Sequence, residues 1–155
     1  MKQDTHLLVG IGASFFILNP MKDLDILVVF LGSIIGSLLP DLDLRVKHRA
    51  LLHNLSVIIL VSLLAMLLEM CLAPRSNTVF ISMYKYFTIS IILSWILHIV
   101  VDMVNPSGVS IIWPLKRTRF KLFRQGVKHD SMLGNISLKI IGMTLLFLYA
   151  YKLVA

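Results

Sequence analysis

Seven histidine and aspartate residues lie at the ends of apolar segments, where ionisable side chains are costly unless they bind a partner. They are His6, Asp41, Asp43, His48, His53, His98 and Asp102. Imidazole nitrogens and carboxylate oxygens together form a natural ligand set for a divalent transition metal. The pattern therefore predicts a metal site, and a metal that activates water would make the protein a hydrolase.

The spacing of these residues carries part of the prediction. His98 and Asp102 are four residues apart, so a helix would place both on one face, about 5–6 Å apart at their Cβ atoms. A polar pair that joins two helices is the alternative interpretation. Asp41 and Asp43 follow Pro40, and taken alone they are more typical of a solvated or capping turn.

The remaining candidates are weak singly and stronger together. Taken alone, His6, His48 and His53 would more often be interfacial or surface residues than ligands. Because seven candidates exceed the four ligands of one tetrahedral zinc, we expect either two metals or a supporting or general-base role for some of them. Arg49 is the expected partner of an oxyanion or phosphate, since guanidinium binds such groups through two bonds. His129 lies in a basic loop, and we expect it to be solvated.

Five apolar stretches must position these residues, which predicts an all-α bundle of about five transmembrane helices. They cover residues 7–18, 24–39, 51–72, 86–104 and 136–154. The third is long enough to cross roughly 30 Å of hydrocarbon, whereas the first is short and is counted as spanning with a re-entrant path as the alternative. A closely packed hairpin of the first two helices is predicted from their glycines. These are Gly10 and Gly12 in the first stretch and Gly32 and Gly36 in the second.

Composition agrees with a single membrane-embedded domain over residues 1–155. Of these residues 57% are hydrophobic and 15% charged, against about 45–50% and 25% in soluble domains. The one cysteine, Cys71, excludes an intramolecular disulfide. The first apolar run lacks a cleavage pattern, so we expect a retained helix rather than a signal peptide.

Topology brings the seven candidates to one membrane face. Five crossings place the N-terminus, the loop before residue 51 and the loop 105–135 on one side, with ten Lys and Arg residues against four on the other. The positive-inside rule makes this side cytoplasmic. All seven candidates then lie at the cytoplasmic end, provided that the first segment crosses fully.

The basic and aromatic loop 105–135 is expected at the lipid headgroups. Nucleic-acid binding by this loop is the less favoured alternative.

The order of the motifs resembles the bacterial membrane-bound, metal-dependent hydrolase family of YdjM type. The resemblance covers roughly residues 5–115 and rests on Thr5-His6, Leu39-Pro40-Asp41-Leu42-Asp43, His48-Arg49-x-x-x-His53, His98-x-x-x-Asp102, Pro106-x-Gly108 and Trp113-Pro114-Leu115. It implies a multi-pass bacterial inner-membrane hydrolase. The family looks distantly similar to zinc-dependent phospholipase C and P1-type nucleases, which implies phosphoester hydrolysis. The chain departs from the family where a small hydroxyl residue usually adjoins the second histidine; Asn54 is the expected replacement.

The sequence thus predicts a cytoplasm-facing site that binds one or two divalent ions, with zinc favoured over manganese or magnesium. The first-choice metal ligands are Asp41, Asp43, His53, His98 and Asp102. Further ligands or proton carriers are His6 and His48. The expected catalytic residues are Asp43, His48 and Arg49.

The expected partner is membrane lipid, with an anionic, lipid-derived phosphoester as substrate and no nucleic acid. An ion or proton-coupled transporter is the alternative, although such sites usually lie at the bilayer midplane within a repeat; a small membrane adaptor is the third.

The topology can be tested with reporter fusions. The excess of basic residues predicts the N-terminus inside and the C-terminus outside, so reporters placed in the connections 73–85 and 105–135 should report opposite sides. If both connections lie on the same side, a single convergent site is excluded.

Overall fold

The computed structural model describes residues 1–45, 52–112 and 118–155, and this part of the chain is helical. In chain order the elements are α1 (Gln3–Leu18), α2 (Asp23–Leu38), the 3-10 segment η1 (Leu39–Arg45), α3 (Leu55–Leu72), the 3-10 segment η2 (Ala73–Arg75), α4 (Thr78–Met103) and α5 (Met132–Val154). Among the described residues the only β-type pairing is an isolated antiparallel bridge between Val109 and Phe120. The all-α prediction is confirmed for these residues.

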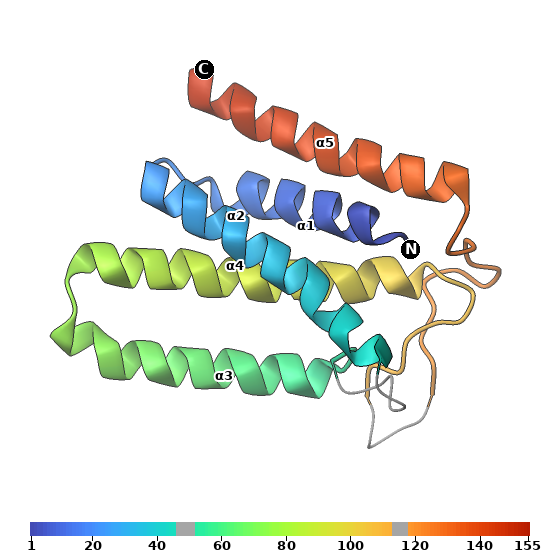
Figure 1. Cartoon of the computed structure of the whole chain (residues 1–155), viewed down its shortest axis with the longest axis horizontal. Coiled ribbons are helices and arrows are strands. Elements are labelled where there is room, and N and C mark those ends of the chain that lie inside the picture. The colour runs from blue at the N-terminus through green and yellow to red at the C-terminus, as the bar shows by residue number, and fades with distance from the viewer. Residues whose placement is uncertain (46–51, 113–117) are drawn as a thin grey trace.

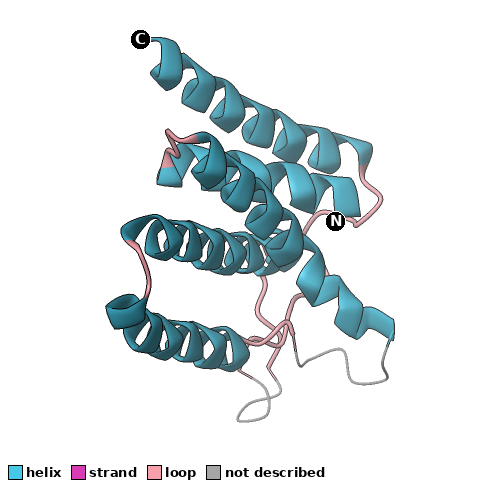
Figure 2. Ribbon diagram, turned by 60° about the vertical axis from the view of Figure 1, so that its left-hand side comes forward, coloured by secondary structure: helices cyan, strands magenta, loops and turns pink. Residues whose placement is uncertain are grey.

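Successive helices run in alternating directions, so that one end of the bundle collects the chain segments that carry the polar candidates. Figure 1 shows the N-terminus, η1, the start of α3, the end of α4 and the start of α5 at this end. The first helix runs along the bundle beside the others and does not turn back. The loops therefore gather at the two ends of the helices (Figure 2).

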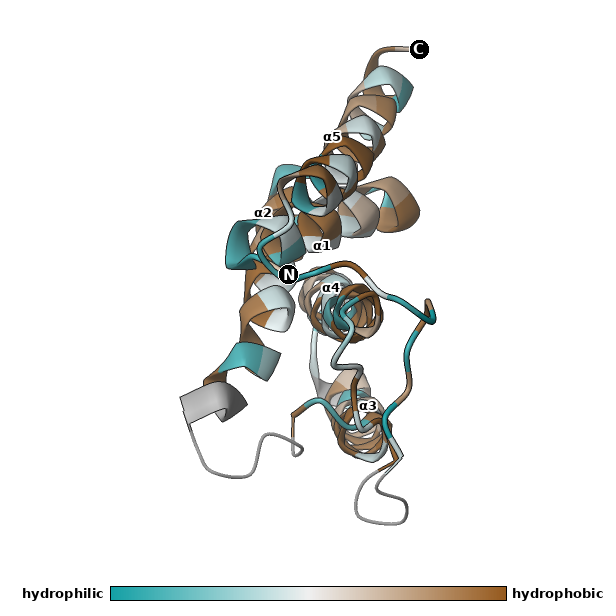
Figure 3. Ribbon diagram, turned by 90° about the vertical axis from the view of Figure 1, so that its right-hand side faces the viewer, coloured by the Kyte–Doolittle hydropathy of each residue, from teal (hydrophilic) through white to brown (hydrophobic). Residues whose placement is uncertain are grey.

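Four of the helical segments are long and apolar enough to cross a membrane: Asp23–Leu42, Leu55–Leu72, Thr78–Met103 and Met132–Val154. At 1.5 Å per residue, the 16 residues of α1 extend about 24 Å, less than the roughly 30 Å of hydrocarbon. The exposed surface of the helices is rich in large apolar side chains, above all along α3, which suits contact with lipid. Seen from the site end, the helices are largely hydrophobic, and hydrophilic residues lie at helix ends and in the connections (Figure 3).

Two helices begin earlier than the apolar pattern indicates. α4 starts at Thr78 rather than Tyr86, because Asn77 caps it by accepting a hydrogen bond of 2.7 Å from the backbone N–H of Phe80. α5 starts at Met132 because Ser131 accepts from the N–H of Gly134. The expectation that residues 78–85 belong to a loop was therefore wrong: polar residues at a helix end lower the local hydropathy without ending the helix.

Several glycines allow helix backbones to approach closely, but the helices that they bring together differ from those expected from the sequence. α1 and α2 do pack together. The glycines of α2, however, face α4: a Cβ at Gly36 would meet the carbonyl of Ile91. Gly12 of α1 lies against Gly142 of α5. The glycine spacing predicts close approach, yet it does not specify the neighbour, and the prediction that these glycines form the α1–α2 contact was wrong for Gly32 and Gly36.

Gly142 provides a test of the α1–α5 packing. A Cβ there would lie 2.6 Å from the Leu8 carbonyl oxygen and 3.0 Å from the Val9 backbone nitrogen, neither of which is on a flexible side chain. We expect Gly142→Val to lower the free energy of unfolding by on the order of 3 kcal/mol. Ala150→Val, at an exposed position on the same helix, should change it by less than about 0.5 kcal/mol. Unfolding in mixed micelles, followed by circular dichroism, measures both; equal effects would refute the packing argument.

Candidate metal site

The carboxylate of Asp102 lies at the centre of the polar cluster, in the last turn of α4. Its Oδ1 is 3.2 Å from His6 Nε2, and its Oδ2 is 3.4 Å from both His53 Nε2 and His98 Nε2. Three histidines from separate segments therefore present the same ring nitrogen to one carboxylate. Asp41 adds a second carboxylate, with Oδ1 3.5 Å from His98 Nε2. Five of the seven predicted residues are brought together.

His98 is held with its Nε2 turned toward these carboxylates. Its Nδ1 lies 2.7 Å from the backbone carbonyl oxygen of Ser37, which can only accept a hydrogen bond, so Nδ1 carries the proton. Carbonyls near a helix C-terminus lack partners within their own helix, and Ser37 lies in the last turn of α2. In the neutral ring Nε2 then carries no proton and presents a lone pair. His98 is almost completely buried, and among the described residues its Nε2 has no hydrogen-bond partner.

The donor atoms are spaced as ligands of one ion would be. With metal–ligand distances of 2.0–2.2 Å, neighbouring ligand atoms of a tetrahedral site lie about 3.3–3.6 Å apart. The four histidine–carboxylate distances above range from 3.2 to 3.5 Å, longer than the roughly 2.7–2.9 Å of a charge-assisted hydrogen bond. Two trios have ligand atoms mutually within 4.8 Å: His6, His98 and Asp102, and Asp41, His53 and His98. The donor set fits a divalent metal.

His6 is positioned by a contact between α1 and α5. Its ring stacks on that of His98, with centroids 3.8 Å apart. The neighbouring Thr5 donates a buried 2.8 Å hydrogen bond to Asn135 Oδ1, which also accepts from the Lys2 backbone N–H. Asn135 Nδ2 donates to the carbonyls of His129 and Ser131. One amide on α5 thus fixes the first turn of α1 and, through it, His6.

His53 lies just before α3 and is held by its neighbours in sequence. The indole N–H of Trp95 donates a 2.7 Å hydrogen bond to the Leu52 carbonyl, which attaches this segment to α4. Asn54 caps α3 by accepting from the backbone N–H of Ser56. The Leu55 N–H donates to the carbonyl of Ile111. Asn54, directly after His53, is therefore a helix cap, and it fixes the backbone beside this histidine.

The other predicted residues are placed as follows. The backbone of Asp43 lies in η1, but its side chain is outside the described part of the structure, as are His48 and Arg49 altogether. Their predicted roles stay predictions. His129 is exposed, as expected for a solvated residue.

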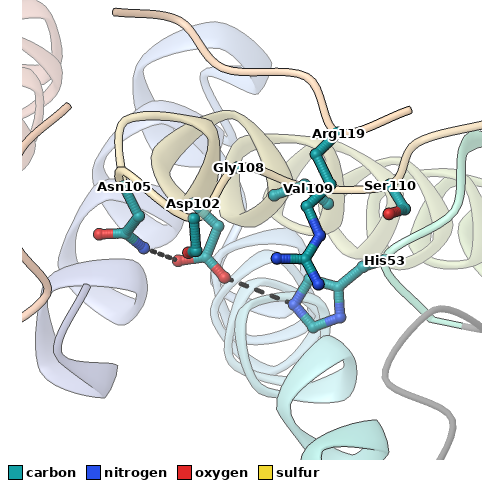
Figure 4. Close-up of a pocket in the computed structure, with 8 residues that line it drawn as sticks. His53, Asp102, Asn105, Gly108, Val109, Ser110 and Arg119 are labelled. Atoms are coloured by element: carbon teal, nitrogen blue, oxygen red, sulfur yellow. Dashed lines mark hydrogen bonds and ion pairs between the residues drawn. The ribbon is translucent and has the colours of Figure 1, made fainter. Parts of the chain in front are cut away.

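Two cavities open on the cluster and reveal residues that sequence reasoning missed. The smaller, of about 190 Å³, is lined by His53, Asp102 and Arg119 together with Asn105 and residues 107–110 (Figure 4). The larger, of about 900 Å³, is reached by Asp41 and Asp102 and is lined in part by Leu38 and Leu42. Asn105 donates a 3.1 Å hydrogen bond to Asp102 Oδ1. The α-ammonium of Met1 also lies 3.0 Å from that oxygen.

An apolar helical bundle with a histidine–aspartate cluster at one end defines a multi-pass membrane protein with a candidate metal site. The YdjM inner membrane protein family matches residues 1–155, and the chain belongs to it. The predicted family and inner-membrane location are thereby confirmed. Comparisons with curated proteins and with solved structures found no match. The distant similarity to phospholipase C and P1-type nucleases stays a prediction.

Metal content tests the cluster. We expect protein purified with zinc to retain it, and His98→Gln or Asp102→Asn to lower occupancy by about tenfold or more, since each removes a central ligand. His129→Gln is the matched control, because it removes an exposed histidine that borders the larger cavity but belongs to neither trio. Elemental analysis of the four proteins decides: equal zinc in all of them would assign His98 and Asp102 to packing.

Proposed function

We propose that the protein is a metal-dependent hydrolase whose site lies at the cytoplasmic end of the bundle and acts on a phosphoester. The observation that carries the proposal is the environment of His98. Its Nδ1 proton is committed to the Ser37 carbonyl, and its Nε2 faces the carboxylates of Asp41 and Asp102. A lone pair and two anionic groups repel one another. The Met1 ammonium lies only at Oδ1 of Asp102, so a cation among Nε2 and the other carboxylate oxygens would remove this repulsion.

Protonation of His98 is the other way to supply positive charge, and the geometry argues against it. An N–H at Nε2 would point to carboxylate oxygens 3.4 and 3.5 Å away, and Nε2 forms no hydrogen bond with a described residue. The Nδ1–H would keep its bond to the Ser37 carbonyl, but the added Nε2–H would be buried without a hydrogen-bond acceptor among the described residues, which is costly. A metal ion satisfies the nitrogen and both carboxylates at once. The carbonyl at Nδ1 then has the orienting role usual for a metal-binding histidine.

The donor types favour zinc. Imidazole nitrogens with carboxylates suit zinc or manganese, whereas magnesium prefers oxygen ligands alone. The single cysteine, Cys71, lies near the end of α3 opposite to His53, so no thiolate takes part. Because the two trios share His98 and its second nitrogen is occupied, the described residues provide for one ion. A second ion would need Asp43 or His48.

A bound ion would supply Lewis acidity, which would activate water and offset negative charge on the reacting group. The chain's own residues fix the geometry. Asn105 holds the Asp102 carboxylate by a hydrogen bond. His6 approaches this carboxylate from α1, and His53 approaches it from the segment before α3. Asp43 and His48 are the proposed proton acceptors, and Arg49 is proposed to orient the anionic group.

A lipid-derived phosphoester suits the surroundings of the cluster. The larger cavity combines apolar residues such as Leu38 and Leu42 with Lys128, which matches a molecule that has both an acyl part and an anionic part. The end of the bundle also carries the basic connection 105–135, which attracts anionic lipid. Both features support an amphipathic substrate that binds close to the proposed ion.

One observation keeps a transporter as the second candidate. Five fully buried serines lie in the bundle among α1, α2 and α4: Ser14, Ser33, Ser37, Ser90 and Ser94. Ser14 and Ser94 share a 3.0 Å hydrogen bond, and Ser33 bonds to the Val29 carbonyl. Such internal bonds suit helix packing, and these serines line none of the four main cavities formed by the described residues. We therefore favour the hydrolase.

Activity assays separate the two functions. Purified protein should hydrolyse phosphoesters, lose this activity with a chelator and regain it with added zinc, and its rate should rise with pH through about neutral. Asp43→Asn should reduce turnover more than stability, and Arg49→Lys should weaken substrate binding more than metal binding. Metal-loaded protein that hydrolyses no phosphoester but moves ions into liposomes in a His98-dependent manner would favour the transporter.

A further inference from the structure

Arg119 is carried to the rim of the smaller cavity by a short backbone pairing. The Val109 N–H donates a 2.9 Å hydrogen bond to the Phe120 carbonyl, and the Phe120 N–H donates one of 2.8 Å to the Val109 carbonyl. The chain turns before this pairing at Gly108, whose φ of +62° favours glycine. The turn that follows α4 and the segment with Arg119 are thereby held together.

The side chain of Arg119 lies beside His53 and Asp102 on the wall of this cavity (Figure 4). Its residue is exposed, and it forms no ion pair with any described carboxylate. Ser107 and Ser110 line the same cavity, and both hydroxyl groups are hydrogen-bond donors. A guanidinium that pairs with no described carboxylate therefore borders an opening that leads to the proposed metal ligands.

We propose that Arg119, with Ser107 and Ser110, binds the phosphoryl group of the substrate in the smaller cavity, beside His53 and Asp102. The inference rests on the proposed function and specifies which end of the substrate lies where. A guanidinium donates two parallel hydrogen bonds to phosphate oxygens. Ser107 and Ser110, which line the same cavity, offer further hydrogen-bond donors for the remaining oxygens of a phosphoryl group.

The size and position of the cavity agree with this assignment. Its volume of about 190 Å³ is several times the roughly 30 Å³ share of one water molecule, so a phosphoryl group fits. The cavity shares Asp102, Asn105 and Ser107 with the larger cavity. A substrate with its phosphoryl group beside Arg119 therefore has room for its remaining part on the side of Leu38 and Leu42.

Binding of inorganic phosphate to the zinc-loaded full chain tests the inference by calorimetry. Arg119→Gln should weaken phosphate binding by about tenfold or more, as loss of a charged hydrogen bond does. Arg119→Lys should weaken it less, because the charge is kept and the planar fork is lost. Arg124→Gln, which removes the same charge from an exposed position outside both cavities, should stay within about twofold of the unaltered chain. Zinc content should be equal in all four.

Three results would overturn the inference: no phosphate binding by the unaltered chain, equal weakening by Arg119→Gln and Arg124→Gln, or loss of zinc together with phosphate in Arg119→Gln. Two substrates, a soluble phosphate monoester and phosphatidic acid in nanodiscs, then distinguish the source of the phosphoryl group. Arg119-dependent phosphate binding without hydrolysis of either substrate would support this anion site and refute the proposed function. Hydrolysis with an unchanged KM in Arg119→Gln would refute the anion site and leave the hydrolase standing.

Discussion

A carboxylate at the end of a membrane-embedded bundle needs positive charge near it, and the surroundings of Asp102 are arranged around this need. The Asp102 side chain is only 18% exposed, and three imidazole Nε2 atoms face it at 3.2–3.4 Å. The ammonium of Met1 and the amide of Asn105 approach Oδ1, whereas Oδ2 faces histidine nitrogens. A divalent ion bound here would satisfy the histidines and both carboxylates, which no single hydrogen bond among them does.

The fold is suited to holding such a cluster because several independent segments converge on it. His98 and Asp102 share one face of α4 as their spacing predicts, while His6 comes from α1 and His53 from the start of α3. Each segment is fixed by polar contacts close to its ligand: the Ser37 carbonyl for His98, the Trp95 indole for the segment of His53, and the amide of Asn135 for the first turn of α1. Side chains fixed in this way suit a preformed site for the proposed ion.

Much of this arrangement could be predicted from the sequence, because alternating apolar segments determine which helix ends share a side. That rule brought His6, Asp41, His53, His98 and Asp102 together without any knowledge of packing. Packing partners could not be predicted in the same way. The glycines of α2 predicted that another helix packs closely against α2, and only the structure shows that this helix is α4. Arg119 and Asn135 were missed because their roles depend on a loop pairing and on an α1–α5 contact, neither of which has a periodic signature.

The central claim is that one divalent ion is bound among these histidines and carboxylates. X-ray absorption spectroscopy at the zinc edge of the metal-loaded protein tests it most directly, because the method reports the types and distances of the ligands. We expect nitrogen and oxygen ligands at about 2.0–2.2 Å, with the multiple scattering of imidazole rings. Zinc coordinated by oxygen alone or through sulfur, with no imidazole signal, would contradict the account.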